Sequence, residues 1–573
     1  MRSIAIVGAG HAGAQLALGL QEHGYDVTLV TDRTPEEVRH GPVMSSQCMF
    51  ETALEIERAH GLNHWDEDAP LIEGIRFTIR DAEGEVVTTW QAPFEGAAQS
   101  IDQRLKVSAW VEQFSRAGGD LRVRAAELSD VDSLARTHDL VIVSTGKGDL
   151  GRMFARDAEK SPFDQPRRVL ALTYVTGMEA RGEHDELAYS KVPGVGEYFV
   201  FRALTCSGPC DIMVFEGVPG GPMDCWEDVR TPQQHLDRSL EILSRFFPDE
   251  ADRCKDVALT DEGGVLRGRL TPTVRHAVGQ THTGAHVLGM ADAVILNDPL
   301  TGQGSNHAAK SADFYLEAIL RRGDADFDAA WMQRTFDQFW RGWGQWAVQW
   351  TNSLLAETSP HLDTLLTEVA DLPGAAREIA NGFDDPRLFY PWWFDGAEAD
   401  RFLAQKRAQE GARFDARDLR QALGQFATGV TVVTSRGSDG RRVGMTANSF
   451  TSVSLDPPLV MWCPSKNAPS LPDYTAASHF AVNVLASHQH HLSRQFATPS
   501  DDKFAGLEVA DGLAGVPLLP DVVASFECRT VARHDAGDHV IFIGEVERYT
   551  ARGGSPLVFH SGFFQVATKH PDI

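Results

Sequence analysis

The sequence predicts two regions of different fold class, an α/β region followed by a β-rich region. In the first region, strand-like apolar runs alternate with helical stretches, which is typical of a domain built on a parallel sheet. A glycine-rich turn directly follows the first of these runs. In the second region, short β-rich runs are separated by turn residues at spacings that indicate a small barrel.

The individual elements follow from these patterns in chain order. Strands of the α/β region are predicted at Ile4–Val7, Val27–Val30 and Leu140–Ser144. A helical part follows at about 310–385. The β-rich runs are Gly429–Ser435, Leu459–Cys463, Phe480–Leu485 and His539–Val546. Residues 396–413 are polar and helix-prone, so we predict a helical linker between a domain at 1–395 and a domain at 414–573.

Length and charge narrow the class of protein. At 573 residues the chain is too long for one core, since a domain takes about 150 residues. It carries 53 Lys and Arg against 80 Asp and Glu, and a net charge of −27 repels nucleic acid and anionic membranes. No apolar run approaches the roughly 20 residues that span a bilayer. We expect neither a nucleic-acid nor a membrane partner.

The N-terminus and the cysteines favour a cytoplasmic protein. The first apolar run leads straight into the glycine-rich turn, without a signal-peptide cleavage site. The 7 cysteines are scattered and form no C-x-x-C pair, so we expect no disulfide framework and no structural zinc site. Cys463 and Cys528 are predicted to be buried small apolar groups.

The glycine-rich turn is a dinucleotide-binding fingerprint. Gly8, Gly10 and Gly13 form G-x-G-x-x-G between a strand and a helix. The first glycine makes the tight turn, the second lets the backbone approach a pyrophosphate, and the third lets helix and strand pack closely. The phosphates would lie at the positive helix N-terminus. Asp32, at the end of the second strand, would accept from a ribose hydroxyl, a role that Thr31 could share.

A second motif far downstream points to the same ligand. Asp292 precedes the loop Asn297–Asn306, which opens a helical run. This arrangement resembles the second FAD fingerprint of the aromatic hydroxylase type of flavoprotein. The resemblance implies that Asp292 binds the ribityl chain and that the loop lies against the isoalloxazine ring. Its implied contacts come from Pro299, Gly302 and Gly304.

One departure from the hydroxylase pattern bears on the source of electrons. Hydroxylases that bind NAD(P)H themselves usually carry an Asp-Gly motif in mid-chain, where this sequence has Thr145-Gly146. The resemblance therefore implies that this FAD is not reduced by pyridine nucleotide bound to the same domain. Reducing equivalents must come from elsewhere.

Three segments together resemble the styrene monooxygenase family. They are Gly8–Gly13, Ser100–Lys106 and Asn297–Asn306. The resemblance implies a Rossmann-like, FAD-binding aromatic hydroxylase fold over residues 1–395, with substrate-domain insertions at about 70–100 and 165–265. It implies that Arg104 contacts the FAD, with a surface salt bridge as the alternative. It also implies an oxygenase that accepts reduced FAD from a separate reductase.

The chemistry of that family needs few protein acids and bases. Reduced FAD and O2 give a C4a-(hydro)peroxide, which is attacked by an electron-rich alkene, indole or thioether. The protein must supply a dry cavity that protects the peroxide, so no catalytic triad is expected. Pro42–Phe50 lies where the family lines its substrate pocket, but departs from the pattern of established styrene epoxidases. The substrate therefore stays open between styrene-like alkenes, indole and thioethers.

Four tryptophans lie in the helical part at the spacing of one helix face. They are Trp340, Trp343, Trp346 and Trp350. We interpret the stripe as core packing, with contact to flavin or substrate as the alternative.

The region after Phe414 resembles the short-chain flavin reductases of two-component monooxygenases. The matching runs are Ala427–Thr434, Gly444–Pro458, Phe480–Leu485 and Gly537–His539. The resemblance implies a split β-barrel, and a homodimer through this domain with flavin sites near the interface.

The same resemblance implies roles for residues of the second domain. Thr446 to Ser449 would bond the polar edge of the isoalloxazine, and Ser465 with Lys466 would meet the flavin phosphate. His539 is the catalytic candidate, placed near the nicotinamide where it could orient NADH. The implied cofactor-binding residues are Thr446, Ala447, Asn448, Ser449, Ser465, Lys466, Asn483, Gly537 and Asp538.

The two resemblances together predict a self-sufficient flavin-dependent monooxygenase. The second domain would reduce FAD with NADH, and the first would spend the reduced FAD on O2 and an aromatic alkene or indole. Two alternatives stay open: a flavin reductase that mainly serves a separate oxygenase partner, and an FAD-binding regulatory module without oxygenase activity. The acidic composition and the absence of an obvious arginine pair for a 2′-phosphate favour NADH over NADPH.

Overall fold

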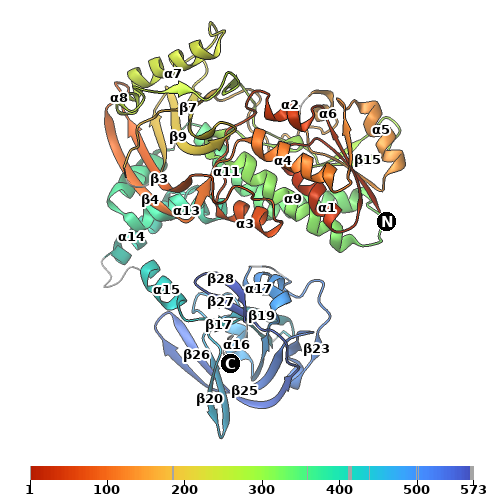
Figure 1. Ribbon diagram of the computed structural model, residues 1–573. Coiled ribbons are helices and arrows are strands. Elements are labelled where there is room, and N and C mark those ends of the chain that lie inside the picture. Colours follow the sequence, from red (N-terminus) through yellow and green to blue (C-terminus); the bar gives the residue numbers. More distant parts are fainter. Residues whose placement is uncertain are drawn as a thin grey trace, which may run out of the picture. The chain divides into compact units, whose positions relative to one another are not determined.

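A computed structural model describes residues 2–146, 148–182, 186–357, 359–410, 416–437, 439–498, 500 and 502–567 (Figure 1). The chain forms two compact units, Met1–Gly411 and Ala412–Ile573. Lys147, Phe414 and the end of the predicted linker lie outside the described residues. In the part of the chain that the structure describes, no helix is long and apolar enough to cross a membrane.

The first unit contains a six-stranded sheet in the order β14-β15-β6-β1-β2-β5. β15, β6, β1, β2 and β5 run parallel, and β14 is antiparallel at the edge. The predicted first strands are confirmed. The strands are β1 (Ser3–Val7), β2 (Asp26–Thr31), β5 (Asp120–Val123), β6 (Leu140–Val143), β14 (Val278–Gln280) and β15 (His286–Gly289).

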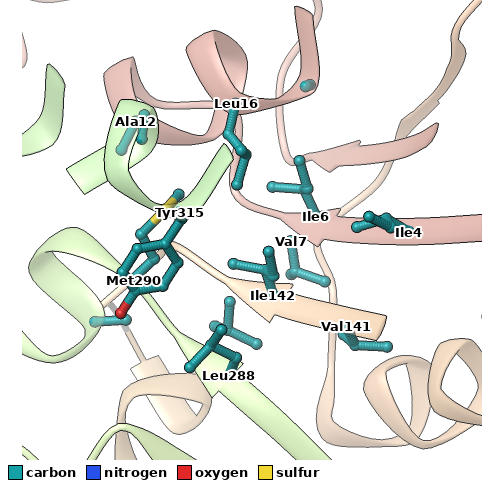
Figure 2. Packing of buried hydrophobic residues seen from close by; sticks show 14 of the residues in the cluster. Ile4, Ile6, Val7, Ala12, Leu16, Val141, Ile142, Leu288, Met290 and Tyr315 are labelled. Carbon is teal, nitrogen blue, oxygen red and sulfur yellow. The ribbon is translucent and has the colours of Figure 1, made fainter. Parts of the chain in front are cut away.

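The core of this sheet explains why its central strands are apolar throughout. Helices cover the sheet, so residues on both faces of β1 and β6 are buried. Figure 2 shows side chains of β1, β6 and β15 meeting those of two helices, α1 (His11–Glu22) and α9 (Gln303–Arg322). Tyr315 of α9 adds a hydrogen bond, since its hydroxyl donates to the Gly289 carbonyl at 3.1 Å. Other helices of the first unit are α2 (Pro35–Arg39), α3 (Glu51–Ala59), α4 (Gln103–Arg116), α5 (Leu128–Thr137) and α6 (Gly148–Arg152).

A second, eight-stranded sheet occupies the regions predicted as insertions. Its order is β11-β7-β10-β9-β8-β3-β4, with β12 also pairing with β7, and only β3 and β8 are parallel. Its alternate residues face two different cores: Ile212 and Val214 face one, and Met213 and Phe215 face the other beneath α7 (Pro232–Phe246). The strands are β3 (Leu71–Arg80), β4 (Val86–Gln99), β7 (Val169–Thr176), β8 (Glu186–Val192), β9 (Gly196–Thr205), β10 (Gly208–Gly217), β11 (Ala258–Leu259) and β12 (Val265–Gly268).

The helical part is confirmed, but its tryptophans do not share one face. Between α10 (Ala329–Phe339) and α11 (Gln345–Leu355), Trp340–Gly344 forms a π-helical turn, which rotates the side chains that follow. Trp340 and Trp343 pack against the core of the first sheet. Trp350 is buried in another core, stacked on Phe389 with ring centroids 4.6 Å apart. The remaining helices are α8 (Pro248–Asp252), α12 (Pro360–Glu368), α13 (Pro373–Gly382) and α14 (Gly396–Glu410).

The second unit is built on a seven-stranded antiparallel sheet in the order β19-β18-β22-β25-β26-β21-β20. A smaller sheet has the order β17-β27-β28, in which β17 is Thr428–Gly429. Cys528 is buried as predicted, whereas Cys463 is only half-buried because it follows the end of β21. The main strands and helices are β18 (Thr431–Arg436), β19 (Arg442–Ala447), β20 (Thr451–Leu455), β21 (Pro458–Trp462), β22 (His479–Val484), β25 (Ala524–Ala536), β26 (His539–Ala551), β27 (Leu557–His560), β28 (Phe563–Val566), α15 (Ala416–Gly424), α16 (Leu471–Ala476) and α17 (His490–Ala497).

Candidate functional site

Two of the three fingerprint glycines are required by packing and the third faces open space. Gly8 has φ +114°, and a Cβ there would lie 2.8 Å from Ser144 Oγ. A Cβ on Gly13 would lie 1.9 Å from the Gly8 carbonyl oxygen. A Cβ on Gly10, by contrast, would meet no described atom within 4 Å. Gly10 directly precedes α1, so this opening lies at a helix N-terminus and fits a pyrophosphate.

The other predicted elements of the first unit lie at the carboxyl ends of neighbouring strands. Ser144, after β6, donates its hydroxyl to the Gly8 carbonyl at 2.8 Å. A Cβ on Gly146 would lie 2.6 Å from the main-chain oxygen of Asp292, which follows β15. The structure therefore brings Gly8, the Thr145-Gly146 segment and Asp292 to one edge of the sheet, where open α/β sheets bind their ligands.

The end of β2 distinguishes the two candidate ribose ligands. The Thr31 hydroxyl is buried and donates to the Arg33 carbonyl at 3.2 Å. The Asp32 side chain is 67% exposed, with its carboxylate 3.6 Å from Arg33 Nε. Asp32 is therefore the more accessible acceptor, and its contact with ribose stays a prediction.

The predicted isoalloxazine loop is joined to the predicted substrate segment. Gly302 caps α9 in the left-handed conformation, with φ +66°. Asn306 accepts from the Phe50 N–H at 2.9 Å and donates to the Cys48 carbonyl at 2.8 Å. Open space surrounds the position of a Cβ on Gly304 among the described residues. The end of the Pro42–Phe50 segment thus lies against the N-terminus of α9.

Arg104 is buried and its donors already have protein partners. Two of its nitrogens each lie 2.9 Å from a carboxylate oxygen of Asp261. Nε donates to Asp102 at 2.9 Å, and the remaining bonds go to Thr205 and the Gly41 carbonyl. To contact FAD, Arg104 would have to exchange some of these partners, and this role stays a prediction. The pair with Asp261 is not a surface salt bridge, because Arg104 is buried.

A buried ionic network beneath the fingerprint was not found from the sequence. Lys106 Nζ lies 2.7 and 2.8 Å from the two carboxylate oxygens of Glu57, and His11 Nε2 lies 3.0 Å from one of them. Burial lowers the pKa of His11. Burial alone would raise the pKa of Glu57, but Lys106 and His11 hold it below its ordinary value. The sequence offered one signal for this network, because a histidine, His11, lies inside the glycine fingerprint.

The same network reaches the substrate segment through amide side chains. Gln103 donates to Gln47 Oε1 at 2.6 Å, and its Nε2 lies 3.5 Å from His11 Nδ1. The residue that opens α1 is thus linked to the Pro42–Phe50 segment.

In the second unit, three predicted motifs lie together at strand ends. Ser449 Oγ accepts from the Cys463 N–H at 2.9 Å. Lys466 N–H donates to the Asp538 carbonyl at 2.8 Å, next to an antiparallel bridge between Ser465 and His539. His539 Nδ1 lies 2.8 Å from Asp538 Oδ1, and this hydrogen bond lowers the pKa of Asp538. The cluster is accessible, since the His539 side chain is 44% exposed.

The remaining predicted residues of this unit are Thr446, Ala447, Asn448, Asn483 and Gly537. Thr446 donates its hydroxyl to the Ser493 carbonyl at 2.6 Å, and Asn448 next to it is exposed. The Ala447 carbonyl accepts from the Thr431 hydroxyl. Asn483 is buried and does not join the cluster: its Nδ2 donates to Val432 and Thr434, and its Oδ1 accepts from Leu519 N–H. Gly537 has φ +62°, which favours glycine in the turn before His539.

Three protein-family models match separate parts of the chain. "Flavin reductase like domain" matches residues 423–568. "Styrene monooxygenase A putative substrate binding domain" matches residues 146–253. "NADP oxidoreductase coenzyme F420-dependent" matches residues 3–42, which contain the glycine fingerprint.

Curated relatives divide the chain in the same way. FMN reductase (NADH) SmoA of Agrobacterium fabrum is 49% identical over 150 residues, which are 26% of this chain and 85% of that protein. Styrene monooxygenase StyA of Pseudomonas fluorescens is 28% identical over 416 residues, which are 71% of this chain and 96% of that protein. The reductase component of the flavin-dependent trigonelline monooxygenase of Acinetobacter baylyi is 46% identical over 27% of this chain, which spans 51% of that relative's length.

The chain is a flavin-dependent monooxygenase that carries its own flavin reductase domain. Its C-terminal part belongs to the flavin reductase family, and the rest of the chain matches styrene monooxygenase StyA. The predicted fusion is confirmed, and the chain is a flavoprotein. The space beside Gly10 is open among the described residues, as the close approach of a dinucleotide to the main chain requires.

Proposed function

We propose that the protein epoxidises styrene-like alkenes or indole, drawing its electrons from NADH, and that it oxidises thioethers by the same route. The observation that carries this proposal is the fusion itself. The sequence of the oxygenase-like unit has Thr145-Gly146 in place of the Asp-Gly motif, and a flavin reductase domain follows in the same chain. The second unit therefore supplies the reduced flavin that the first unit consumes.

In the oxygenase unit, the main chain at Gly10 holds the FAD pyrophosphate, while Gly8 and Gly13 shape the turn around it. Asp32 and Asp292 bind the sugar and ribityl hydroxyls. Bound flavin, once reduced, supplies the chemistry that activates O2 for transfer of one oxygen atom. The role of this chain is to orient the ring against the Asn297–Asn306 loop and to exclude water. A predominantly apolar surrounding serves that purpose.

The proposed substrate class rests on the aromatic face of the second sheet. Phe77 stacks on Tyr189 with centroids 5.0 Å apart, and Tyr189 on Phe199 at 5.9 Å. These rings belong to the same buried cluster as Phe50 of the substrate segment and Leu300 of the flavin loop. Most side chains of this cluster are apolar or aromatic, so a planar, uncharged ring suits it.

In the reductase unit, Thr446, Ala447, Asn448 and Ser449 bind the isoalloxazine. Ser465 and Lys466 bind the phosphate, and His539 with Asp538 orients NADH.

We propose that this unit pairs as a homodimer. Three apolar side chains are strongly exposed: Leu423 at 66%, Phe426 at 78% and Leu455 at 93%. A partner subunit that covered these side chains would remove them from water. We also propose that the enzyme works in the cytoplasm.

Product analysis tests the proposal. Purified protein with NADH, FAD, air and styrene should give styrene oxide, and indole should give an indigo precursor. Stoichiometric hydrogen peroxide without an oxygenated product would contradict it. A companion oxygenase added to the same mixture should not take over most of the turnover.

A further inference from the structure

Two buried carboxyl groups meet between the second sheet and the flavin loop. Glu216 lies on β10 and Asp298 in the loop, and both are 0% exposed. Asp298 Oδ1 accepts from the Leu300 N–H at 3.2 Å. Among the described residues, Asp298 Oδ2 and both oxygens of Glu216 have no hydrogen-bonding partner other than the facing carboxyl group.

Among the described residues, no cation is shown in an ion pair with Glu216 or Asp298. Glu197 is opposite Glu216 in the ladder between β9 and β10, but it is bonded to Arg168 at 2.6 and 2.9 Å. The other facing groups lie on β8: Tyr189, which is uncharged, and Lys191, which is next to Glu197 in the ladder. Because Arg168 and Glu197 are paired with each other, their charges cancel and Arg168 does not compensate the charge of Glu216 or Asp298. Two carboxylates in contact inside a protein cannot both be ionised at a moderate cost.

We propose that Glu216 and Asp298 share one proton at neutral pH, and that this proton holds the flavin-facing loop Asn297–Gly302 in place. The loop's orientation toward flavin rests on the proposed function. Burial is the main reason that the pKa of Glu216 is raised far above its ordinary value, followed by repulsion from Asp298. If the proton left, the repulsion would push Asp298 away from Glu216. Leu300 N–H would then lose its acceptor and the turn Pro299–Thr301 would open. Both residues are positioning residues.

Hydrogen exchange on the full-length wild-type protein, without flavin, tests the coupling. Protection of the peptide covering Asn297–Gly302, corrected for the intrinsic rate, should fall about tenfold per pH unit once the pair loses its proton. In Glu216→Gln, no second carboxylate is left to repel Asp298, so protection should stay flat over the same range. Asp211→Asn is the matched control: it lies on the same strand but near Arg202, and its profile should follow that of the wild type.

Infrared spectroscopy gives a second readout that needs neither flavin nor turnover. The wild type should show the C=O stretch of a protonated carboxylic acid at neutral pH, and this band should be lost in Glu216→Gln. If that variant does not fold, Asp298→Asn serves in the exchange experiment, where protection should also stay flat because residue 298 then carries no charge for Glu216 to repel. Identical exchange profiles for wild type and Glu216→Gln, or the absence of the band from the wild type, would overturn the proposal. Failure to oxygenate styrene would leave both readouts unaffected and would refute only the proposed function.

Discussion

The two flavin-related regions of this chain are built in different ways. In the oxygenase unit, the predicted ligand edge is formed by glycines and main chain, and the charged side chains beneath it are buried and paired with one another. In the reductase unit, the predicted ligands are polar side chains at strand ends, and His539 and Asp538 are accessible. Substitution of a buried charged residue should therefore cost stability in the first unit, and substitution of an accessible polar ligand should cost catalytic rate in the second.

The largest expected effect is on the stability of the oxygenase unit. Glu57→Gln removes the only carboxylate bonded to Lys106 among the described residues, and both side chains are 0% exposed. A buried cation without its partner costs about 3–5 kcal/mol, which urea unfolding of the first unit should detect. The cost should shrink when Lys106→Met is added, because no charge is then left buried.

A substitution on the same layer of helices provides the control for that measurement. Glu112→Gln removes one partner of Arg116 on α4, where the arginine is 80% exposed. Its free energy of unfolding should change by less than about 1 kcal/mol. Equal losses for Glu57→Gln and Glu112→Gln would remove the contrast between buried and exposed charge.

The next largest effect is expected on product formation, without a change in the stability of the fold. Gly10→Val places a side chain in the space kept open for the pyrophosphate, so product formation should fall at least about 100-fold while NADH oxidation continues. Gly268→Val is the matched control, since the space around its Cβ is also open among the described atoms, but it lies on β12 of the second sheet. Unchanged product formation in Gly10→Val would show that the cofactor assignment is wrong.

The sequence predicted the parts of the molecule that local patterns determine. Apolar runs located β1 and β6, and the glycine spacing located the turn at Gly8, because strand burial and left-handed backbone leave a local signature. It did not predict the partner of Arg104. Asp261 lies far away in the chain and meets Arg104 only through tertiary packing. Glu216 had a signal, an acidic residue in an otherwise apolar run, but its partner Asp298 depends on how the loop reaches the second sheet.

In the reductase unit, substitution of His539 should change the rate of NADH oxidation and leave the stability of the fold unchanged. His539→Ala should slow NADH oxidation about tenfold, because the nicotinamide loses an orienting contact. Urea unfolding should be unchanged, since the side chain is accessible. Oxygenation should persist when FAD is reduced chemically. His534→Ala, on the same hairpin and also exposed, should oxidise NADH at the wild-type rate.

The smallest effect should come from Asp538→Asn. The hydrogen bond from His539 lowers the pKa of Asp538, so the pair contributes stability above the ordinary carboxyl range and loses it as the pH falls through the lowered pKa. Asp538 is almost fully exposed, so water screens this contribution and thermal unfolding near neutral pH should not change. The KM for NADH should rise a few-fold with kcat nearly constant, because the carboxylate orients His539 without touching the transferred hydride. A large loss of stability in Asp538→Asn would mean that the reductase cluster, like the ionic network under the oxygenase fingerprint, is part of the fold.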